Sequence, residues 1–419
     1  MEKSVRGFRN RDIENDPRVE LSVRKVMNSV IKQGDRAVFS YTKKYDNFEI
    51  TRDTLKVSTH EFNNAKRSIS NELNSYLAIA AKRIRAYQRK KLPKEKTFTD
   101  SFGNKLGWLI RPIEKVGIYV PGGKASYPST VLMTAIPAKL AGVEHISMVT
   151  PCPNGEINPA VLVAASIAGV NSIYKIGGSQ AIAALAYGTE SIPKVDKIVG
   201  PGNIYVTIAK KLVFGEVDID MIAGPTEVLI ISDGSIPSDW VAVDLLAQAE
   251  HDEMSIPLLV TDSIQFARRV VDSLTVRLKK LKRVKIAKEA VKRQGRIFVV
   301  EDLHDAARVA NLIAPEHLEI CVKNPRRLLN KIKHAGAIFL GPLSTEAFGD
   351  YVAGPSHVLP TGGAARFSSP LSVNDFLKMP SVVSISKMGF KKLQKSVVGL
   401  ANSEDLEAHA LSVDVRADN

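Results

Sequence analysis

Cysteine is almost absent from this chain, since only Cys152 and Cys321 occur among its 419 residues. Two cysteines exclude a framework of several disulfides and a metal site built from several thiolates. Any bound metal would therefore need nitrogen and oxygen ligands. Both cysteines flank predicted strands, so we expect small buried side chains rather than catalytic thiols.

Long apolar runs are missing as well. No stretch approaches the ~18 apolar residues that predict a membrane-spanning helix. The N-terminal segment MEKSVRGFRNRDIEND has no apolar core of the kind found in secretory signals. We therefore expect a cytoplasmic protein with no membrane partner.

Positive charge is abundant, and the formal net charge is +14. Much of the excess lies in residues 268–296, where basic side chains alternate with leucine and valine at helical spacing. A nucleic-acid-binding protein is therefore an alternative class, and it would bind in a strongly salt-dependent way. However, the segment has no interleaved aromatic residues, and no zinc finger or other nucleic-acid motif accompanies it. We interpret it as the solvated face of a helix and expect no nucleic-acid partner.

The order of secondary structure predicts an α/β fold. The first hundred residues have mainly helical periodicity, whereas short β-branched runs alternate with Ala-rich helical segments from Lys115 onward. Such alternation predicts right-handed crossovers and largely parallel sheets, and eight runs indicate two α/β units. The segment after Leu371 is interpreted as a small C-terminal appendage with a helix near its end. The predicted strands cover residues 116–120, 146–150, 172–176, 196–200, 227–232, 256–262, 296–302 and 337–341.

Three predicted strands end in glycine-rich turns, and none of these turns has the GxGxxG pattern of the ordinary dinucleotide fingerprint. Each turn opens a helix, whose first amides can bind an anion or a polar ligand group. Taken singly, each turn could equally be an ordinary loop between strand and helix. Three turns at corresponding strand ends favour a shared crevice. Their sequences are YVPGGKASYPST, KIGGSQAIAALA and IVGPGNIYVTIA.

Two pairs of residues could carry chemistry at the ends of predicted elements. Gln248 and His251 lie three residues apart and share one helix face, so they could hold a metal together, although a surface histidine is commoner at such a place. Glu316 and His317 adjoin where a helical pattern gives way to a strand, and a carboxylate beside an imidazole can handle protons.

Two later segments contain further candidates. Asp350 and His357 lie in FGDYVAGPSHVLPTGG, a polar glycine-rich loop, and Asp350 could serve as a hard metal ligand. Glu404 and His409 lie five residues apart near the final helix, where an exposed helical position is the default interpretation. A mixed nitrogen and oxygen site would suit zinc, but spacing alone does not bring these segments together.

Read together and in order, the motifs resemble the histidinol dehydrogenase family over essentially the whole chain. The matching motifs are VGIYVPGG, GGSQAIAALAYGT, VGPGN, AGPTEV, LLAQAEHD, APEHLE, GDYVAGPSHVLPT and EDLEAH. The resemblance implies an oxidoreductase of histidine biosynthesis that uses zinc and NAD. Its substrate would be L-histidinol, oxidised through L-histidinaldehyde to L-histidine in a four-electron reaction with two NAD+.

The resemblance also implies one zinc ion per subunit, held by Gln248, His251, Asp350 and His409. It further implies that His409 and Glu404 reach the site from the other subunit of a homodimer. The substrate would contact the zinc-ligand side chains together with Thr226, His317 and Glu404. The NAD contacts implied by the family are Tyr119, Gln180 and Asn203, one from each turn.

The implied fold comprises two duplicated, incomplete Rossmann-like α/β/α domains similar to those of aldehyde dehydrogenases, with small helical appendages at both ends. Residues 1–14 would form an N-terminal arm, and residues 15–118 with 228–371 a discontinuous first α/β domain. Residues 119–227 would form the second α/β domain, and residues 372–419 a small domain that contacts the partner subunit.

For the mechanism, we expect His317 to act as general base during each hydride transfer and Glu316 to activate water for attack on the aldehyde. Neither cysteine is needed, so a thiohemiacetal route is disfavoured. Two rival enzymes remain at this stage: a relative that oxidises another alcohol, such as a sulfonated diol, and a zinc hydrolase that uses Glu316 as base and needs no NAD.

Overall fold

The computed structural model describes residues 17–122 and 126–417. The predicted N-terminal arm, residues 1–14, lies outside the described residues. The chain divides into two compact units: the first comprises residues up to 91 and 114–375, and the second residues 92–113 and those from 376 onward. The second unit thus includes residues 92–113, which the sequence analysis assigned to the first α/β domain. In the described part of the chain, no helix has the length and apolar character needed to cross a membrane.

The first five-stranded sheet of unit one, called sheet one below, has the strand order β6-β5-β4-β7-β8. All of its strand pairs are parallel, and β4 lies between β5 and β7, so the direction of strand addition reverses at β4. Its strands are β4 (Lys115–Tyr119), β5 (His145–Val149), β6 (Ser172–Tyr174), β7 (Lys197–Val199) and β8 (Asp218–Ile219).

Helices cover both faces of sheet one. The connecting helices are almost entirely apolar and therefore buried, and several begin at favourable residues: Pro159 opens α8, and the side chain of Asn158 caps it. On one face lie α7 (Pro128–Ala141) and α8 (Pro159–Ala168), which pack against α5 (Thr59–Ser68) and α6 (Asn71–Lys90). On the other lie α9 (Gly178–Tyr187), α10 (Ile204–Val213), α2 (Pro17–Gln33) and α3 (Asp35–Asp46); a short α4 (Arg52–Leu55) follows α3.

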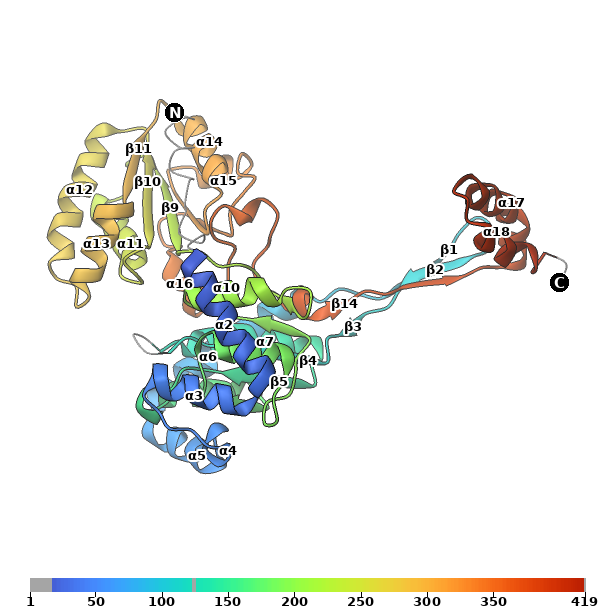
Figure 1. Ribbon diagram of the computed structural model, residues 1–419. Helices are drawn as coiled ribbons and strands as arrows, with labels where there is room; N and C mark the ends of the chain where they lie inside the picture. Colours follow the sequence, from blue (N-terminus) through green and yellow to red (C-terminus); the bar gives the residue numbers. More distant parts are fainter. Residues whose placement is uncertain (1–16, 123–125, 418–419) are drawn as a thin grey trace. The chain divides into compact units, whose positions relative to one another are not determined.

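The second sheet, called sheet two, repeats this design with the parallel order β11-β10-β9-β12-β13. Its strands are β9 (Glu227–Ser232), β10 (Ile256–Thr261), β11 (Arg296–Val299), β12 (His317–Cys321) and β13 (Ala337–Leu340). One face is covered by α11 (Ser238–Ala249), α12 (Ile264–Leu278) and α13 (Val284–Gln294), and the other by α14 (Leu303–Ile313) and α15 (Pro325–Leu329) (Figure 1). Helix α16 (Glu346–Tyr351) follows β13.

Two expectations about individual segments are confirmed here. The basic segment 268–296 lies mainly in α12 and α13, and most of its lysine side chains are exposed. Cys152 and Cys321 are both buried and unpaired. Burial raises the pKa of the Cys152 thiol to about 12 and also raises that of Cys321.

The second unit is built from antiparallel strands and two helices. One sheet has the order β1-β2-β15, with β1 (Lys96–Thr99), β2 (Lys105–Trp108) and β15 (Ser381–Ser384); β3 (Arg111–Pro112) pairs with β14 (Leu377–Lys378). Helices α17 (Lys387–Ser403) and α18 (Glu407–Asp414) complete the unit. The sequence analysis predicted its terminal helix but none of these strands.

Candidate active site

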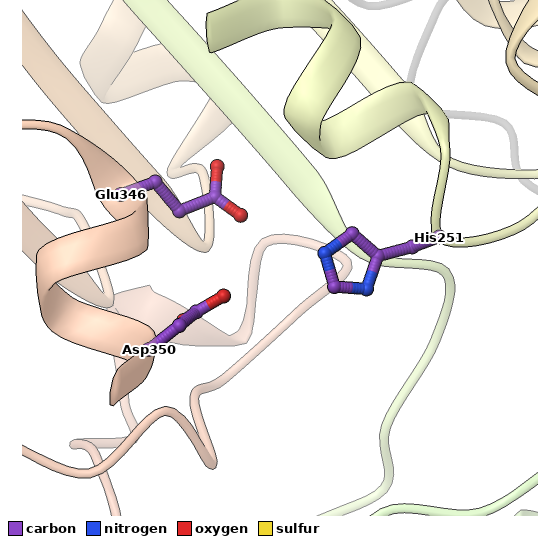
Figure 2. Close-up of side chains that lie close together, drawn as sticks. All are labelled: His251, Glu346 and Asp350. Carbon is purple, nitrogen blue, oxygen red and sulfur yellow. The ribbon is translucent and has the colours of Figure 1, made fainter. Parts of the chain in front are cut away.

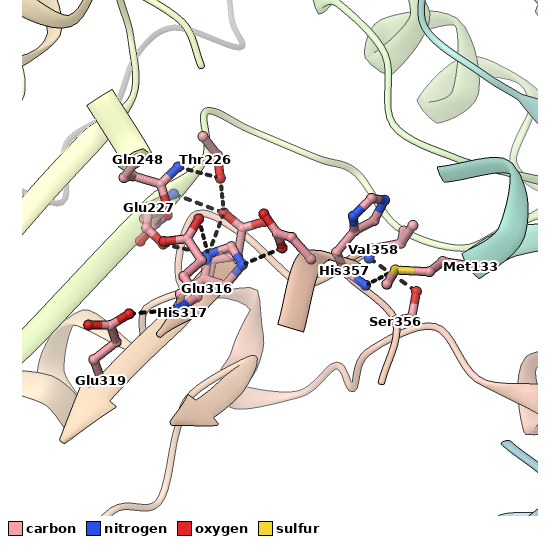
Figure 3. A network of polar contacts seen from close by, with 12 residues as sticks. Met133, Thr226, Glu227, Gln248, Glu316, His317, Glu319, Ser356, His357 and Val358 are labelled. Carbon is pink, nitrogen blue, oxygen red and sulfur yellow. Dashed lines mark hydrogen bonds and ion pairs between the residues drawn. The ribbon is translucent and has the colours of Figure 1, made fainter. Parts of the chain in front are cut away.

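The candidate site lies at the amino ends of two neighbouring strands of sheet two, β9 and β12. The register pairs His317 with Val228, which places Thr226 and Glu227 beside Glu316 and His317. Glu227, Glu316 and His317 are all buried. Figure 3 shows the resulting network of polar contacts around Glu316 and His317.

Glu316 is fixed by two hydrogen bonds from the start of β9. Its Oε2 accepts from the Thr226 hydroxyl at 2.5 Å and from the backbone N–H of Glu227 at 2.8 Å. Burial raises the pKa of Glu316 to about 7, although the charge of His317 and both hydrogen bonds oppose the shift. A carboxyl group with a pKa near neutrality can exchange protons under physiological conditions.

His317 is oriented by the backbone and surrounded by carboxylates. Its Nδ1 lies 3.0 Å from the carbonyl oxygen of Glu227, which can only accept, so Nδ1 carries a proton. Its buried Nε2 has no hydrogen-bond partner among the described residues and lies 3.7 Å from a carboxylate oxygen of Asp350. Burial lowers the pKa of His317, but the charges of Glu346, Glu316 and Asp350 outweigh this effect and hold it well above the usual value.

A possible metal site adjoins His317. His251, Glu346 and Asp350 each offer a ligand atom, and these atoms lie within 4.8 Å of one another. Figure 2 shows the three side chains pointing toward one another, Glu346 and Asp350 from α16 and His251 from the loop that follows α11. Burial lowers the pKa of His251, so its imidazole is neutral and has a lone pair available for a ligand bond.

Gln248 completes the group from the last turn of α11. Its amide lies 2.9 Å from the Thr226 hydroxyl. In one orientation its oxygen faces only acceptors; in the other its nitrogen donates to the two carboxylate oxygens of Glu346 at 3.0 and 3.1 Å. The first orientation is unfavourable unless a cation lies between these oxygen atoms.

Short elements hold these side chains in place. Glu346 and Asp350 lie four residues apart on α16 and therefore share one face of the helix. The backbone N–H of Glu346 donates to Oε1 of Glu319 at 2.7 Å, which ties the start of α16 to β12. Within the glycine-rich loop that follows α16, Nε2 of His357 lies 3.0 Å from the hydroxyl of Thr130 on α7.

The predicted cofactor contacts gather at the carboxyl ends of strands in sheet one. Tyr119 ends β4, and its buried hydroxyl accepts from the backbone N–H of Gly178 at 3.1 Å, which joins two of the turns. Gln180 is buried in the first turn of α9, and its Oε1 has no partner among the described residues. Asn203 is exposed and caps α10, since its Oδ1 accepts from the N–H groups of Tyr205 and Val206.

The three turns do not follow three adjacent strands. β4 pairs directly with β7, but β6 lies beyond β5, and the hydroxyl of Tyr119 joins the turn after β6 to the end of β4. The strand order reverses between β4 and β7, and α/β sheets commonly bind ligands at such a point.

The structure brings some predicted residues together and leaves others apart. Thr226, Gln248, His251, Asp350 and the Glu316–His317 pair gather at one place in unit one. Glu404 and His409 belong to unit two, at the end of α17 and within α18, and both are exposed.

Glu346 was missed by the sequence analysis. Its spacing of four from Asp350 in EAFGD was the available signal, because that spacing aligns two carboxylates on one helix face. No helix was predicted there, because α16 has only six residues and is too short to leave a clear helical period in the sequence.

Comparison with known proteins identifies relatives along almost the whole chain. A family model described as histidinol dehydrogenase matches residues 9–417. Histidinol dehydrogenase from Syntrophotalea carbinolica is 53% identical over 398 residues, which cover 95% of this chain and 92% of that relative. The crystal structure of histidinol dehydrogenase from Elizabethkingia anophelis has a TM-score of 0.92 at 38% identity and covers 96% of this chain and 92% of its own.

A more distant structure shares the fold alone. Betaine aldehyde dehydrogenase from Staphylococcus aureus has a TM-score of 0.53 at 10% identity, with 88% of this chain and 87% of its own covered. The predicted α/β fold of aldehyde-dehydrogenase type is thereby confirmed. From the family model and the high identity along almost its whole length, the chain belongs to the histidinol dehydrogenase family.

Proposed function

We propose that this chain oxidises L-histidinol through L-histidinaldehyde to L-histidine, the last steps of histidine biosynthesis, with two NAD+ as hydride acceptors and a zinc ion that binds the substrate. One observation carries the proposal: the converging ligand atoms of His251, Glu346 and Asp350, with Gln248 beside Glu346, lie next to the Glu316–His317 pair. The names of the relatives support histidinol as the substrate.

The residues present fit a divalent cation. Three ligand atoms converge, and in one orientation the Gln248 oxygen joins them among acceptors only. Among the described residues, no lysine or arginine lies within 4.0 Å of the carboxylates of Glu316 or Glu346, so their charge lacks a basic partner other than His317.

Gln248, His251 and Asp350 would hold the ion, with His409 from a second copy as the fourth ligand; nitrogen and oxygen donors of this kind suit zinc. When bound, zinc supplies a template that orients the substrate and offsets the negative charge around His317.

The residues of sheet one also fit a dinucleotide. The turn between β7 and α10 and the turn before α9 both lie at the carboxyl ends of parallel strands, where α/β sheets commonly bind dinucleotides. The unpartnered Oε1 of Gln180 is a buried acceptor, which a ligand donor would satisfy. We assign Tyr119, Gln180 and Asn203 to this contact. NAD+ supplies the hydride acceptor for both oxidations.

His317 serves as the general base in the proposed reaction. Because its Nδ1 proton is held by the carbonyl of Glu227, Nε2 is the nitrogen that would accept the proton of the substrate hydroxyl as hydride departs, once a bound cation offsets the carboxylate charges that raise the pKa of His317. The same nitrogen accepts a proton during the second oxidation.

Glu316 serves as the base for the water that attacks the aldehyde. Thr226 and the N–H of Glu227 fix one carboxylate oxygen, which leaves Oε1 for the water. A pKa raised to about 7 makes this carboxylate a stronger base than an exposed one. The Thr226 hydroxyl links Glu316 to Gln248, so the base and the metal group share one support.

A homodimer would complete the site. In unit two, many large apolar side chains on or next to the strands and both helices are 38 to 65% exposed, a pattern typical of a surface covered by another chain. Glu404 and His409 lie in the same unit, so a second copy could supply both. These apolar residues are Phe98, Met379, Val382, Val383, Ile385, Met388, Val397, Leu400, Leu406, Leu411 and Val415.

The deciding experiment is an assay of chelator-treated protein with histidinol and NAD+, followed by addition of zinc. We expect no NADH from the treated protein, restored formation of two NADH per histidinol on zinc addition, and histidine as the product by mass spectrometry. NADH formation that is indifferent to zinc would contradict the metal role. Oxidation of small diols in preference to histidinol would contradict the substrate.

A further inference from the structure

A buried ion pair lies behind the turn that follows β7. Lys210 comes from α10 and Asp220 from the residues just after β8, and their side chains are only 3% and 1% exposed. Neither residue belongs to the group of side chains assigned above to the cofactor or the metal.

Both members of the pair bind the same glycine. Nζ of Lys210 donates to the carbonyl oxygen of Gly200 at 2.9 Å, and the N–H of Gly200 donates to Oδ2 of Asp220 at 2.7 Å. Oδ1 of Asp220 accepts from the N–H of Met221 at 2.7 Å and also from Lys210. Both backbone polar groups of Gly200 are therefore occupied by one ion pair.

Gly200 is also confined by the neighbouring strand. Its φ of +111° favours glycine, and a Cβ at this position would lie 2.1 Å from the carbonyl oxygen of Tyr119. The turn therefore leaves no room for a side chain beside the end of β4, at the point where the strand order reverses. Asn203, three residues later, caps the helix that carries Lys210.

Stability alone does not explain a pair of charges in this place. Apolar side chains of similar volume are often as stabilising as a buried ion pair, because removing two charges from water is costly. What apolar side chains could not do is hold a backbone N–H and a backbone carbonyl in one position. We propose that Lys210 and Asp220 are positioning residues that set the Gly200–Asn203 turn for NAD+; this inference rests on the proposed placement of the cofactor.

The test compares cofactor affinity in Lys210→Met and in Lys210→Met/Asp220→Asn. The double variant removes both charges but keeps an oxygen that can accept from Gly200, so it avoids leaving an unpartnered buried carboxylate. We expect the Kd for NADH, measured by its fluorescence on binding, to rise about tenfold in both variants, the effect of one lost net hydrogen bond. The KM for histidinol should stay near the wild-type value.

Lys197→Met provides the matched control. Lys197 is another buried lysine of sheet one, and its Nζ lies 2.8 Å from Asp218, but both residues begin their strands, at the end opposite the turn. If the effect of Lys210 were a general loss of stability, Lys197→Met with a similar fall in Tm would weaken NADH binding equally. We expect its Kd to stay unchanged.

The outcomes separate this inference from the cofactor placement. If Asn203→Ala and Gln180→Ala weaken NADH binding but the folded Lys210 variants do not, the positioning role is wrong and the placement stands. If Asn203→Ala and Gln180→Ala also have no effect, the proposed placement itself is wrong. Should neither Lys210 variant fold, Asp220→Asn carries the same test, and unchanged NADH affinity in that variant would overturn the inference.

Discussion

Sheet one and sheet two have the same strand order, yet they differ in how their buried charges are paired. Sheet one and its helices bury Lys175, Lys197 and Lys210, whereas the buried acids of sheet two and its surroundings include Glu316, Glu319 and Glu346. Each buried lysine forms an ion pair with an aspartate or glutamate. In contrast, among the residues that the structure describes, no lysine or arginine pairs with these three glutamates.

The difference teaches what each sheet can bind. The buried lysines of sheet one are neutralised by acidic partners within the protein. The predicted cofactor contacts at the carboxyl ends of its strands, Tyr119, Gln180 and Asn203, are uncharged side chains. The carboxylates of sheet two lack such partners, and a buried carboxylate is stable only with a proton, a hydrogen-bond network or a cation. The two candidate sites also lie at opposite ends of their strands. The glycine-rich turns of sheet one follow the carboxyl ends of its strands, whereas Glu316 and His317 lie at the amino end of β12 in sheet two.

The largest effect should come from Glu316→Gln. We expect oxidation of histidinaldehyde to slow by about 10²–10⁴, the usual contribution of a general base, while aldehyde formation from histidinol continues. Rapid-quench measurement of each half-reaction checks this. Equal slowing of both oxidations in this variant would show that Glu316 and His317 do not have the separate roles proposed here.

The rate of the second step, the oxidation of histidinaldehyde, should also depend on pH. Glu316 must be ionised to accept a proton from water, and its pKa is raised to about 7. The rate of aldehyde oxidation should therefore fall as the pH falls through this value, and the Glu316→Gln variant should lose that dependence.

Glu346→Gln should have the next largest effect. Glu346 lies within reach of the metal group and beside the Gln248 amide, so its loss should weaken zinc binding by about 10- to 100-fold, as for residues that support metal ligands. Competition with a chromogenic chelator measures the affinity. Lys197→Met in sheet one is the control; a similar weakening there would remove the contrast between the sheets.

A smaller effect concerns stability and pH. Burial and the charge of Asp244 raise the pKa of Glu319 to about 8 from 4.5. The folded protein therefore binds more protons than the unfolded chain between these values, and this group's contribution to stability falls as the pH rises from 4.5 to about 8. We expect the Tm of the metal-free protein to fall from pH 6 to pH 9 and Glu319→Gln to reduce that fall. A Tm difference between wild type and variant that is constant with pH would contradict the assignment.

Replacing the cysteines should have the least effect. Each lies near one sheet, and burial raises both pKa values, to about 12 for Cys152, so little thiolate forms at neutral pH. Cys152→Ala/Cys321→Ala should keep the wild-type rate, and mass spectrometry should find neither thiol alkylated in the folded protein at pH 8. Inactivation that tracks alkylation of either cysteine would reopen a thiol mechanism.

Much of the fold could be predicted because its signals are local. β-branched runs followed by glycine and by Ala-rich helices specify parallel sheets, and the expected α/β fold, family and oxidoreductase class are confirmed by the structure and the comparisons. The strands of unit two were not predicted. β1, β2 and β15 are each four residues long, and β15 pairs with a segment from the first third of the chain.

The candidate site could be predicted only in part. Gln248 and His251 are close in the sequence, as are Glu316 and His317, so each pair could be predicted, although α11 ends at Ala249 and His251 lies in the turn after the helix rather than on its face. Their meeting with Asp350 depends on β9 and β12 lying side by side, which spacing does not reveal. The roles assigned to all these residues, and the supply of His409 by a partner, stay predictions.

The pairing of β2 with β15 also bears on how the chain folds. During synthesis, residues 92–113 emerge long before residues 381–384, so the β1–β2 hairpin must wait without its third strand. An isolated two-stranded ribbon is only marginally stable in water, and such late, distant pairings are slow to form. The second unit should therefore be the last part of the chain to fold, and a ribosome-bound chain lacking its final segment should expose this hairpin to proteases and chaperones.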